Sequence, residues 1–219
     1  MDCPAATVFC DFDGTVTSID TFDAVVSAAT PQLWAELKQQ LFNFEINLRQ
    51  GMQALADGLT PEDLERMVNH MGQFAPRPCF LPFLAALERA GLPFVLVSGG
   101  LVPLVDEVLG PHRHRLHQLI AAEVLPHSQG GLRFHSPFAN DQELVAKAEV
   151  VKRYGRGLCV VIGDSITDLG MAEVADLVFA REPLSSWLEQ RGIAFYPWDS
   201  FADVEAVLRQ QGLLPGAAA

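Results

Sequence analysis

The stretch Thr7-Val8-Phe9-Cys10-Asp11-Phe12-Asp13-Gly14-Thr15-Val16-Thr17 decides the fold of this chain of 219 residues. Its first part is apolar and rich in β-branched and aromatic residues, which is typical of a buried strand. Ligands of an open parallel sheet bind outside the carboxyl ends of its strands, where Asp11 and Asp13 would lie. Two carboxylates placed so close together repel each other unless a cation, a proton or a polar ligand joins them. The stretch therefore predicts a metal ion at the end of the first strand.

Strand and helix patterns alternate along the rest of the chain. We expect strands over Phe94–Val97, Leu119–Leu125, Leu158–Ile162, Leu177–Ala180 and Ile193–Tyr196, and a short hairpin strand over Leu132–His135. We expect helices over Leu81–Ala90, Leu101–Leu109 and Asp141–Tyr154, and from the end of Gly163–Asp168 to about Ala175. This alternation predicts an α/β fold with a doubly wound, parallel, Rossmann-like sheet.

Residues 18–77 interrupt this alternation because they contain helix signals and no convincing strand. Thr30-Pro31 and Thr60-Pro61 each place a capping hydroxyl before a proline suited to the first helical position. We therefore expect a small helical insert over 18–77, with residues 1–17 and 78–219 forming the main domain. The proline-rich stretch over 75–78 is the expected hinge between the two.

Composition excludes several classes of partner. The formal net charge of −12 disfavours both nucleic acids and anionic membrane surfaces. Cys3, Cys10, Cys79 and Cys159 show no CxxC spacing, so we expect free thiols rather than a disulfide framework or a zinc site. No apolar run reaches membrane-spanning length, and no secretory signal precedes the first strand. We expect a soluble protein of the cytoplasm, either a monomer or a homodimer.

Polar residues follow three of the predicted strands at the same edge of the sheet: Asp11 and Asp13, Ser98, and Asp164. Carboxylate oxygens are hard ligands suited to Mg²⁺. Ser98-Gly99-Gly100 is expected to open a helix, where a hydroxyl and free N–H groups hold an anion. Lys147 lies on the apolar arc of the predicted helix over Asp141–Tyr154, whereas Lys152 lies on its polar face. Lys147 is therefore the expected counter-charge.

Four motifs in this order resemble those of the haloacid dehalogenase superfamily of phosphatases. They are Asp11-Phe12-Asp13-Gly14-Thr15, Ser98, Lys147 and Gly163-Asp164-Ser165-Ile166-Thr167-Asp168. The helical insert between the first two motifs resembles the type 1 cap of the phosphoserine phosphatase-like branch. Asp13 favours cleavage of C–O–P over C–halogen bonds, because the dehalogenases that name the superfamily lack a second acid there.

The resemblance implies a role for each motif residue. Asp11 would be the nucleophile that forms an aspartyl-phosphate, and Asp13 would act as the general acid and base. Thr15 and Ser98 would hold phosphate oxygens while Lys147 neutralises charge. Mg²⁺ would be held by Asp11, the Asp13 carbonyl and Asp164, with Asp168 orienting a metal-bound water or Lys147.

These motifs predict a Mg²⁺-dependent phosphomonoesterase acting on a small phosphorylated metabolite. Phosphoserine is one alternative substrate, although no obvious carboxylate–arginine pair in the insert would claim an amino acid. Two other functions compete: a catalytically idle phosphometabolite-binding regulatory protein, and phosphoryl transfer to another acceptor. Arg49 and Asp20 are polar residues of the insert that could reach the substrate, a plain surface position being the alternative. For the basic run over His112–His117, we expect a solvated loop.

Overall fold

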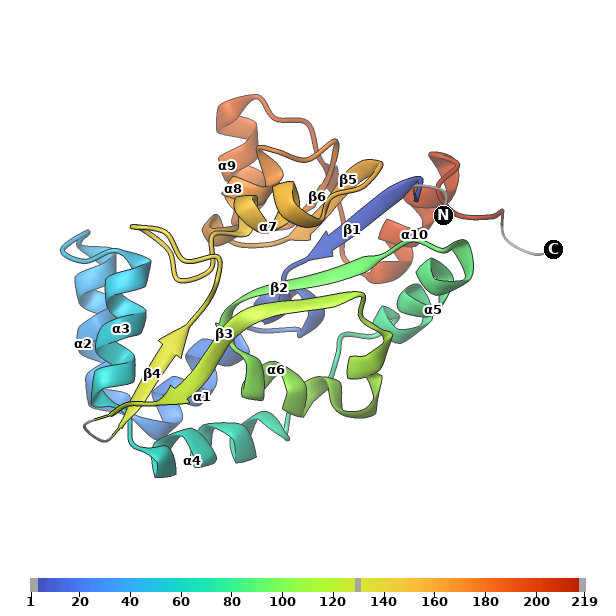
Figure 1. Cartoon of the computed structure of the whole chain (residues 1–219). Coiled ribbons are helices and arrows are strands. Elements are labelled where there is room, and N and C mark those ends of the chain that lie inside the picture. The colour runs from blue at the N-terminus through green and yellow to red at the C-terminus, as the bar shows by residue number, and fades with distance from the viewer. Residues whose placement is uncertain (1–3, 129–130, 217–219) are drawn as a thin grey trace.

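A seven-stranded sheet forms the centre of the computed structural model, which describes residues 4–128 and 131–216 (Figure 1). The strand order is β4-β3-β2-β1-β5-β6-β7. The strands are β1 (Ala6–Cys10), β2 (Phe94–Leu101), β3 (Gln118–Pro126), β4 (Leu132–His135), β5 (Leu158–Gly163), β6 (Leu177–Ala180) and β7 (Tyr196–Pro197). All neighbours pair in parallel except β3 and β4, which form an antiparallel hairpin. The predicted doubly wound α/β fold is confirmed.

Strand β1 lies at the point where the order of the strands reverses. Its Phe9 is in register with Val95 of β2 on one side and with Val161 of β5 on the other. All five residues of β1 are buried, because helices cover both faces of the sheet. Crevices at such a reversal are the usual binding sites of open α/β sheets, so the ends of β1, β2 and β5 define the site.

The helices form two layers, one on each face of the sheet (Figure 1). Helices α7 (Lys147–Tyr154), α8 (Leu169–Ala172) and α9 (Leu184–Arg191) share one apolar core with Phe9 and Val161. Helices α5 (Phe80–Ala90), α6 (Val102–Leu109) and α10 (Phe201–Gln210) share the other with Val8 and Cys10. Successive residues of a strand point to opposite faces, which is how one strand serves both cores.

Four helices follow β1 in the chain and lie together beside β3 and β4 (Figure 1). They are α1 (Thr21–Ala29), α2 (Pro31–Phe42), α3 (Leu48–Gly58) and α4 (Pro61–Met71), and we call them the cap helices. Thr60 caps α4 as predicted, and it forms a capping box with Asp63. Thr30 does not cap α2, because its hydroxyl donates instead to the Val26 carbonyl of the preceding helix at 3.2 Å. The bounds of the insert, 18–77, stay a prediction.

Two helix predictions at the site were wrong in extent. The helix predicted over Asp141–Tyr154 begins only at Lys147. Before it, the Asn140 side chain accepts hydrogen bonds from the Gln142 and Glu143 N–H groups and holds a turn. Ser98-Gly99-Gly100 does not open a helix, because β2 continues through a bulge to Leu101, which pairs with Ala122, and α6 begins at Val102.

Smaller differences lie near the carboxyl end. Helix α8 ends at Ala172, three residues before the predicted end. The strand predicted over Ile193–Tyr196 begins only at Tyr196. Gly192 ends α9 in a left-handed conformation, and the Ile193 N–H returns to the Leu188 carbonyl at 3.0 Å, so this residue completes the helix end. Helices α9 and α10 themselves were not predicted.

The remaining predictions concern the surface and the thiols. The run over His112–His117 falls mostly in a 3₁₀ helix over Gly110–Arg115 rather than a loop. Its arginines form ion pairs, Arg113 with Asp106 at 2.9 Å and Arg115 with Glu88 at 2.7 Å, so neighbouring carboxylates neutralise the positive charge of both arginines. Free thiols are confirmed for Cys10, Cys79 and Cys159, and Cys3 lies outside the described residues. Within the described part of the chain, no helix is long and apolar enough to cross a membrane.

Candidate active site

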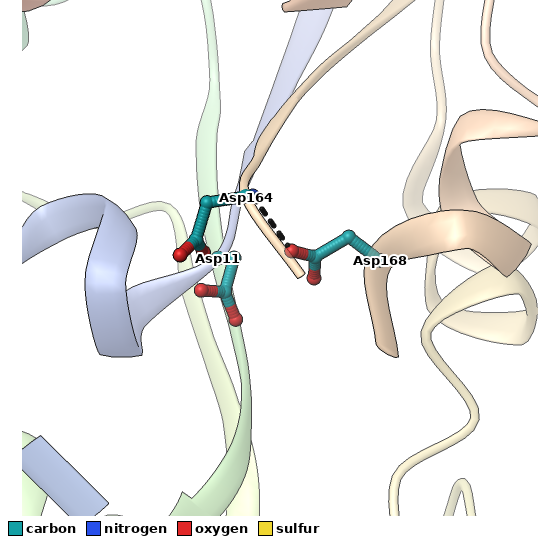
Figure 2. Close-up of side chains that lie close together, drawn as sticks. All are labelled: Asp11, Asp164 and Asp168. Carbon is teal, nitrogen blue, oxygen red and sulfur yellow. Dashed lines mark hydrogen bonds between the residues drawn. The ribbon is translucent and has the colours of Figure 1, made fainter. Parts of the chain in front are cut away.

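Three carboxylates from two strand ends and a turn meet at the centre of the sheet edge (Figure 2). Asp11 follows β1, Asp164 follows β5, and Asp168 ends a short 3₁₀ turn (Ile166–Asp168). One oxygen from each lies within 4.8 Å of the others. Asp11 and Asp168 are buried, being 4% and 0% exposed. The convergence expected from the parallel sheet therefore brings Asp11 and Asp164 together.

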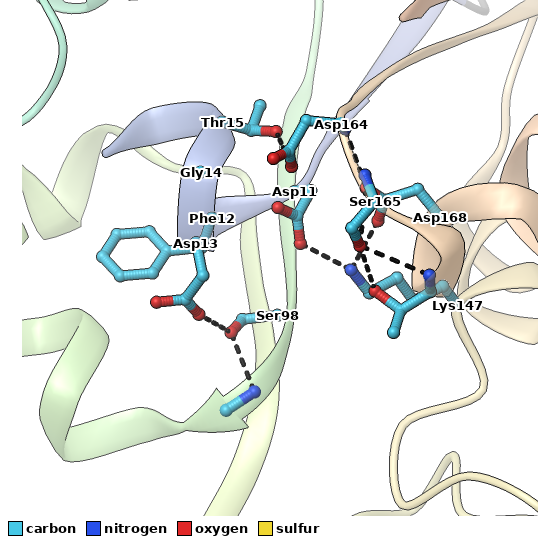
Figure 3. Close-up of polar contacts among 12 residues, drawn as sticks. Asp11, Phe12, Asp13, Gly14, Thr15, Ser98, Lys147, Asp164, Ser165 and Asp168 are labelled. Atoms are coloured by element: carbon cyan, nitrogen blue, oxygen red, sulfur yellow. Dashed lines mark hydrogen bonds and ion pairs between the residues drawn. The ribbon is translucent and has the colours of Figure 1, made fainter. Parts of the chain in front are cut away.

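Lys147 lies among these carboxylates, as Figure 3 shows. Its Nζ donates to Asp11 Oδ1 at 2.5 Å and to Asp168 Oδ1 at 2.6 Å. Burial alone would lower the pKa of Lys147, but the charges of Asp11 and Asp168 hold it above its ordinary value. Lys152 is instead exposed and pairs with Glu149 at 2.7 Å. The structure thus brings Lys147, and not Lys152, to the site.

Negative charge still exceeds positive charge in this cluster. The pKa of Asp11 is well above its ordinary value, because burial and the neighbouring Asp168 outweigh the attraction of Lys147. Asp11 Oδ2 is buried and has no hydrogen-bond partner among the described residues. By contrast, Asp168 Oδ1 accepts from Lys147, and its Oδ2 accepts from the Asp164 and Ser165 N–H groups at 3.0 Å each. The unpartnered Asp11 oxygen, beside Asp164, fits a bound cation.

Asp13 points away from the cluster although it is only two residues from Asp11 (Figure 3). Its Oδ1 accepts from the Thr21 hydroxyl at 2.5 Å and from the Phe22 N–H at 2.9 Å, both in α1. Its Oδ2 accepts from the Ser98 hydroxyl at 3.3 Å. Burial raises the pKa of Asp13 to about 6 despite the hydrogen bond from Thr21, which lowers it. Asp11 and Asp13 thus have different environments.

The turn after β1 brings the chain against Asp164. Thr15 Oγ1 donates to Asp164 Oδ1 at 2.9 Å, so the hydroxyl predicted to hold phosphate holds this carboxylate here. Gly14 has φ of +83° and lies so close to Asp164 that a Cβ would fall 2.3 Å from its Oδ2. Both the backbone conformation and the close approach require glycine at this position.

Of the residues predicted to hold the anion, Gly99, Gly100 and Lys147 line a cavity of about 380 Å³, whereas Thr15 and Ser98 are not part of its lining. Gly99 and Gly100 line it together with Asp11, Asp13, Lys147 and Asp164. The N–H of Gly100 donates to Ser98 Oγ at 3.0 Å, which orients the serine hydroxyl towards Asp13. Ser98-Gly99-Gly100, predicted to hold an anion at a helix start, lies instead near the end of strand β2.

Arg49 is not part of this cavity. Its guanidinium donates to the Asn140 carbonyl at 2.5 Å, and it lines a separate hollow beside β4. The Arg49 N–H also donates to the Gln142 carbonyl at 2.9 Å. This residue therefore joins helix α3 to the turn before Lys147. Asp20, the other polar residue proposed in the insert, does line the cavity.

Arg77 is a structural residue of the site that sequence reasoning missed. Its guanidinium donates to the carbonyls of Gly14, Thr15 and Thr17 at 2.8, 3.1 and 3.1 Å. Its guanidinium carbon also lies 5.6 Å from the centre of the Trp198 ring. The only sequence signal was an arginine between two prolines in the expected hinge, which indicates a constrained backbone but no target.

Replacing Arg77 with alanine is expected to lower the free energy of unfolding by about 2 kcal/mol, because the carbonyls of the turn lose a charged donor. The turn carries Asp13 and holds Asp164, so we expect any catalysis at this site to slow by about tenfold. Arg77→Lys should recover only part of both losses, since one ammonium cannot match the geometry of the planar guanidinium. Urea unfolding and initial rates measure these effects, and full activity in Arg77→Ala would contradict the assignment.

Comparisons with known proteins agree with this geometry. A family model described as haloacid dehalogenase-like hydrolase matches residues 8–173. A 2-hydroxy-3-keto-5-methylthiopentenyl-1-phosphate phosphatase of Microcystis aeruginosa is 35% identical over 204 residues, covering 92% of this chain and 96% of the relative. A protein of the same name from Geobacillus kaustophilus is 30% identical, covering 94% of this chain and 97% of the relative.

Solved structures share the fold. A phospho-aspartyl intermediate analogue of phosphoserine phosphatase superposes with a TM-score of 0.69 at 19% identity, covering 94% of this chain and 99% of that chain. A phosphoserine phosphatase from T. onnurineus has the same TM-score and identity, covering 95% and 98% of the two chains. Structural similarity at this level of sequence identity shows a shared fold and nothing about function.

The fold, the carboxylate cluster and these relatives together define a phosphatase. The chain belongs to the haloacid dehalogenase-like hydrolases, as the resemblance of its four motifs predicts.

Proposed function

We propose that this phosphatase hydrolyses 2-hydroxy-3-keto-5-methylthiopentenyl-1-phosphate, an intermediate of methionine salvage, in the cytoplasm. Relatives of this name that align over nearly their whole length support the substrate. The observation that carries the chemistry is the contrast between two neighbouring carboxylates. Asp11 contacts Lys147, whereas Asp13 contacts Thr21 and Ser98 and has a raised pKa of about 6. Carboxylates in such different environments are suited to different roles.

Asp11 acts as the nucleophile in this proposal. One of its oxygens attacks phosphorus, the new O–P bond forms, and the bond from phosphorus to the ester oxygen breaks. Lys147 compensates the charge of the aspartyl-phosphate and is itself held by Asp168. Asp168 thus serves by positioning Lys147, because both of its oxygens already accept hydrogen bonds.

Asp13 acts as the acid and then as the base. In the first step its carboxylic acid gives a proton to the departing ester oxygen, which leaves as an alcohol. In the second step its carboxylate takes a proton from the water that attacks the phosphorus of aspartyl-phosphate. Asp11 and inorganic phosphate are released, and Asp13 is again protonated. Ser98 orients the Asp13 carboxyl throughout.

Asp11, Asp164 and the Asp13 carbonyl are the residues proposed to hold Mg²⁺. Mg²⁺ would neutralise the phosphate and allow an anionic nucleophile to approach it. Carboxylate oxygens match the preference of this ion, and the unpartnered Asp11 Oδ2 is the observation that supports it. Thr15 supports the ion indirectly, by fixing Asp164.

Substituting Asp13 with alanine should slow the hydrolysis of substrates with poor leaving groups much more than the hydrolysis of substrates with good ones. For alkyl phosphates, whose alkoxide departs poorly without a proton, we expect kcat to fall by about 10²–10⁴-fold. For 2,4-dinitrophenyl phosphate, whose phenolate needs no proton to depart, the bond-breaking step should be nearly unchanged, as a burst of dinitrophenolate in rapid mixing would show. Equal losses in that burst and in alkyl phosphate turnover would contradict the role of Asp13 as an acid.

Mg²⁺ should stabilise the folded protein, because the cation relieves repulsion between Asp11 and Asp164. We expect the Tm to rise with Mg²⁺ concentration in wild type, and to rise far less in Asp164→Asn. Asp199→Asn, which changes a carboxyl at the far edge of the sheet beside β7, is the control and should respond like wild type. This thermal measurement requires no turnover. An equal response in Asp164→Asn would exclude Asp164 as a ligand.

The substrate is tested by a panel of phosphometabolites assayed with purified protein and Mg²⁺. We expect the methylthiopentenyl phosphate to be hydrolysed with the highest kcat/KM, and phosphoserine at least about 10²-fold less efficiently. Preference for phosphoserine would overturn the proposed substrate. Phosphate found on a new position of the substrate, with little released, would instead indicate a transferase.

A further inference from the structure

We infer that the cap side of the cavity is a binding site for an apolar or thioether chain, with Trp34 as its wall and Asp23 as the residue that positions Trp34. The inference rests on the proposed function and deepens it, because it names the residues that bind the carbon side of the phosphate ester. It depends on the side chains that line the cavity opposite the strand ends.

Apolar side chains from three cap helices line the same cavity as Asp11. They are Phe22 of α1, Trp34 and Leu41 of α2, and Leu48 and Met52 of α3. A substrate whose phosphate lies at Asp11 would extend its carbon chain between these helices. Apolar walls of this kind stabilise a chain by about 0.8 kcal/mol for each methylene removed from water.

Trp34 is held in one orientation. Its indole Nε1 donates to Asp23 Oδ1 at 2.7 Å, and its ring packs edge-on against Phe22 with the ring centres 5.7 Å apart. Lys38 also donates to Asp23 Oδ1 at 2.7 Å. Burial alone would raise the pKa of Asp23, but the hydrogen bonds from Lys38 and Trp34 lower it, so Asp23 remains an anionic acceptor. Trp34 is only 7% exposed and thus forms a rigid wall.

The charges around the cavity disfavour an amino acid as substrate. Of the described residues that line it, the cationic ones are Lys38 and Lys147, and both are already paired with aspartates. Asp20 and Glu143 add negative charge that would repel a substrate carboxylate. Arg49, the nearby arginine, donates to the Asn140 carbonyl and lines another hollow. A carboxylate would therefore enter without a free counter-charge.

Alkylphosphonates test the inference without turnover, as competitive inhibitors of p-nitrophenyl phosphate hydrolysis with Mg²⁺. The series is methyl-, propyl- and pentylphosphonate, with 3-(methylthio)propylphosphonate as the thioether matched to pentyl. We expect the inhibition constant to fall by about fourfold per methylene, the factor to which ~0.8 kcal/mol corresponds. The thioether should equal pentylphosphonate within about twofold, and 2-amino-3-phosphonopropionate should bind no better than methylphosphonate.

Variants connect the chain-length effect to the named residues. Trp34→Ala should reduce it to less than about twofold per methylene, and Met52→Ala should weaken it independently. Asp23→Ala should resemble Trp34→Ala, whereas Asp23→Asn should restore the effect because the amide oxygen still accepts from the indole N–H. Trp187→Ala is the matched control, since this tryptophan lies on α9 outside the cavity lining and is 38% exposed.

A flat series in wild type would overturn the inference, as would tighter binding of 2-amino-3-phosphonopropionate than of propylphosphonate. If Trp34→Ala does not fold, Met52→Ala, Asp23→Ala and Asp23→Asn still test the inference. An unchanged chain-length effect in Met52→Ala and in Asp23→Ala would exclude Met52 and Asp23 from the subsite. Failure here is distinct from failure of the proposed substrate. If the inhibition constant does not change with chain length but the methylthiopentenyl phosphate is hydrolysed rapidly, only the subsite is wrong. If the inhibition constant falls with chain length but that phosphate is not hydrolysed, only the proposed substrate is wrong.

Discussion

Replacing Asp11 with asparagine is expected to lower phosphatase activity by a factor on the order of 10⁴ or more, because an amide oxygen does not attack phosphorus at a useful rate. The same variant should still fold. Asp11 lies within reach of Asp164 and Asp168, and neutral asparagine removes repulsion from that cluster while Lys147 keeps its bond to Asp168. We therefore expect a Tm at least equal to that of wild type in Mg²⁺-free buffer.

Two measurements complete this test. Acid quenching during turnover of ³²P-labelled substrate should leave label on wild-type protein and none on Asp11→Asn. Asp57→Asn, an exposed change on α3, controls for the substitution and should keep both label and activity. Label retained by Asp11→Asn would show that another residue is the nucleophile.

Gly14→Ala is expected to cause the largest loss of stability among the site substitutions, about 3 kcal/mol of unfolding free energy. Part of this, about 1 kcal/mol, is the cost of placing alanine at a φ of +83°. The remainder comes from the 2.3 Å approach of the new Cβ to Asp164 Oδ2, which must be relieved by moving a carboxylate that Thr15 holds. Activity should fall by about 10²-fold as Asp164 is displaced.

Gly91→Ala separates these two contributions. Gly91 has a φ of +67°, and nothing lies within 4 Å of the position of its Cβ. It should therefore cost only the conformational part, about 1 kcal/mol, and leave activity unchanged. Chemical denaturation and initial rates measure both variants. Equal losses of stability for Gly14→Ala and Gly91→Ala would show that contact with Asp164 carries no cost.

The sequence predicts the sheet well because its central strands are buried on both faces. Such strands read as continuous apolar runs, and β1, β2 and β5 were found within a few residues of their bounds. Their parallel order then brings Asp11 and Asp164 together without further information. The two-residue strand β7 lacked this signal and was placed three residues too early.

Side-chain hydrogen bonds that compete with helix formation limited how well the helix bounds near the site could be predicted. The pattern from Asp141 to Tyr154 has helical spacing, but Asn140 turns the chain and delays α7 until Lys147. The apolar arc that favoured Lys147 over Lys152 was drawn for a helix over Asp141–Tyr154, and the part of that helix before Lys147 does not form. The choice itself agrees with the geometry because Val150 and Val151 do face the core.

Tertiary contacts of polar groups were not predictable from local pattern. Arg77 reaches three carbonyls about 60 residues away in the chain, and nothing in its own neighbourhood indicates these partners. Arg49 is exposed, donates to the Asn140 carbonyl and lies outside the lining of the cavity, a position that its charge in the sequence does not indicate. Thr15 holds Asp164 through a side-chain bond across 149 residues. Such pairs follow from the fold, which must be known first.

The hydrogen bond from the Arg77 N–H to the Val16 carbonyl, 2.6 Å long, has a consequence for how this protein can diversify. The chain leaves the sheet for helices α1–α4 and returns from them at two adjacent points. A different helical segment could therefore be grafted between Thr17 and Arg77 while every strand keeps its neighbours. Trp34 and Met52 belong to that segment. An exchange that keeps the contacts of Thr21 and Phe22 with Asp13 would therefore change the substrate preference and leave the reacting residues in place.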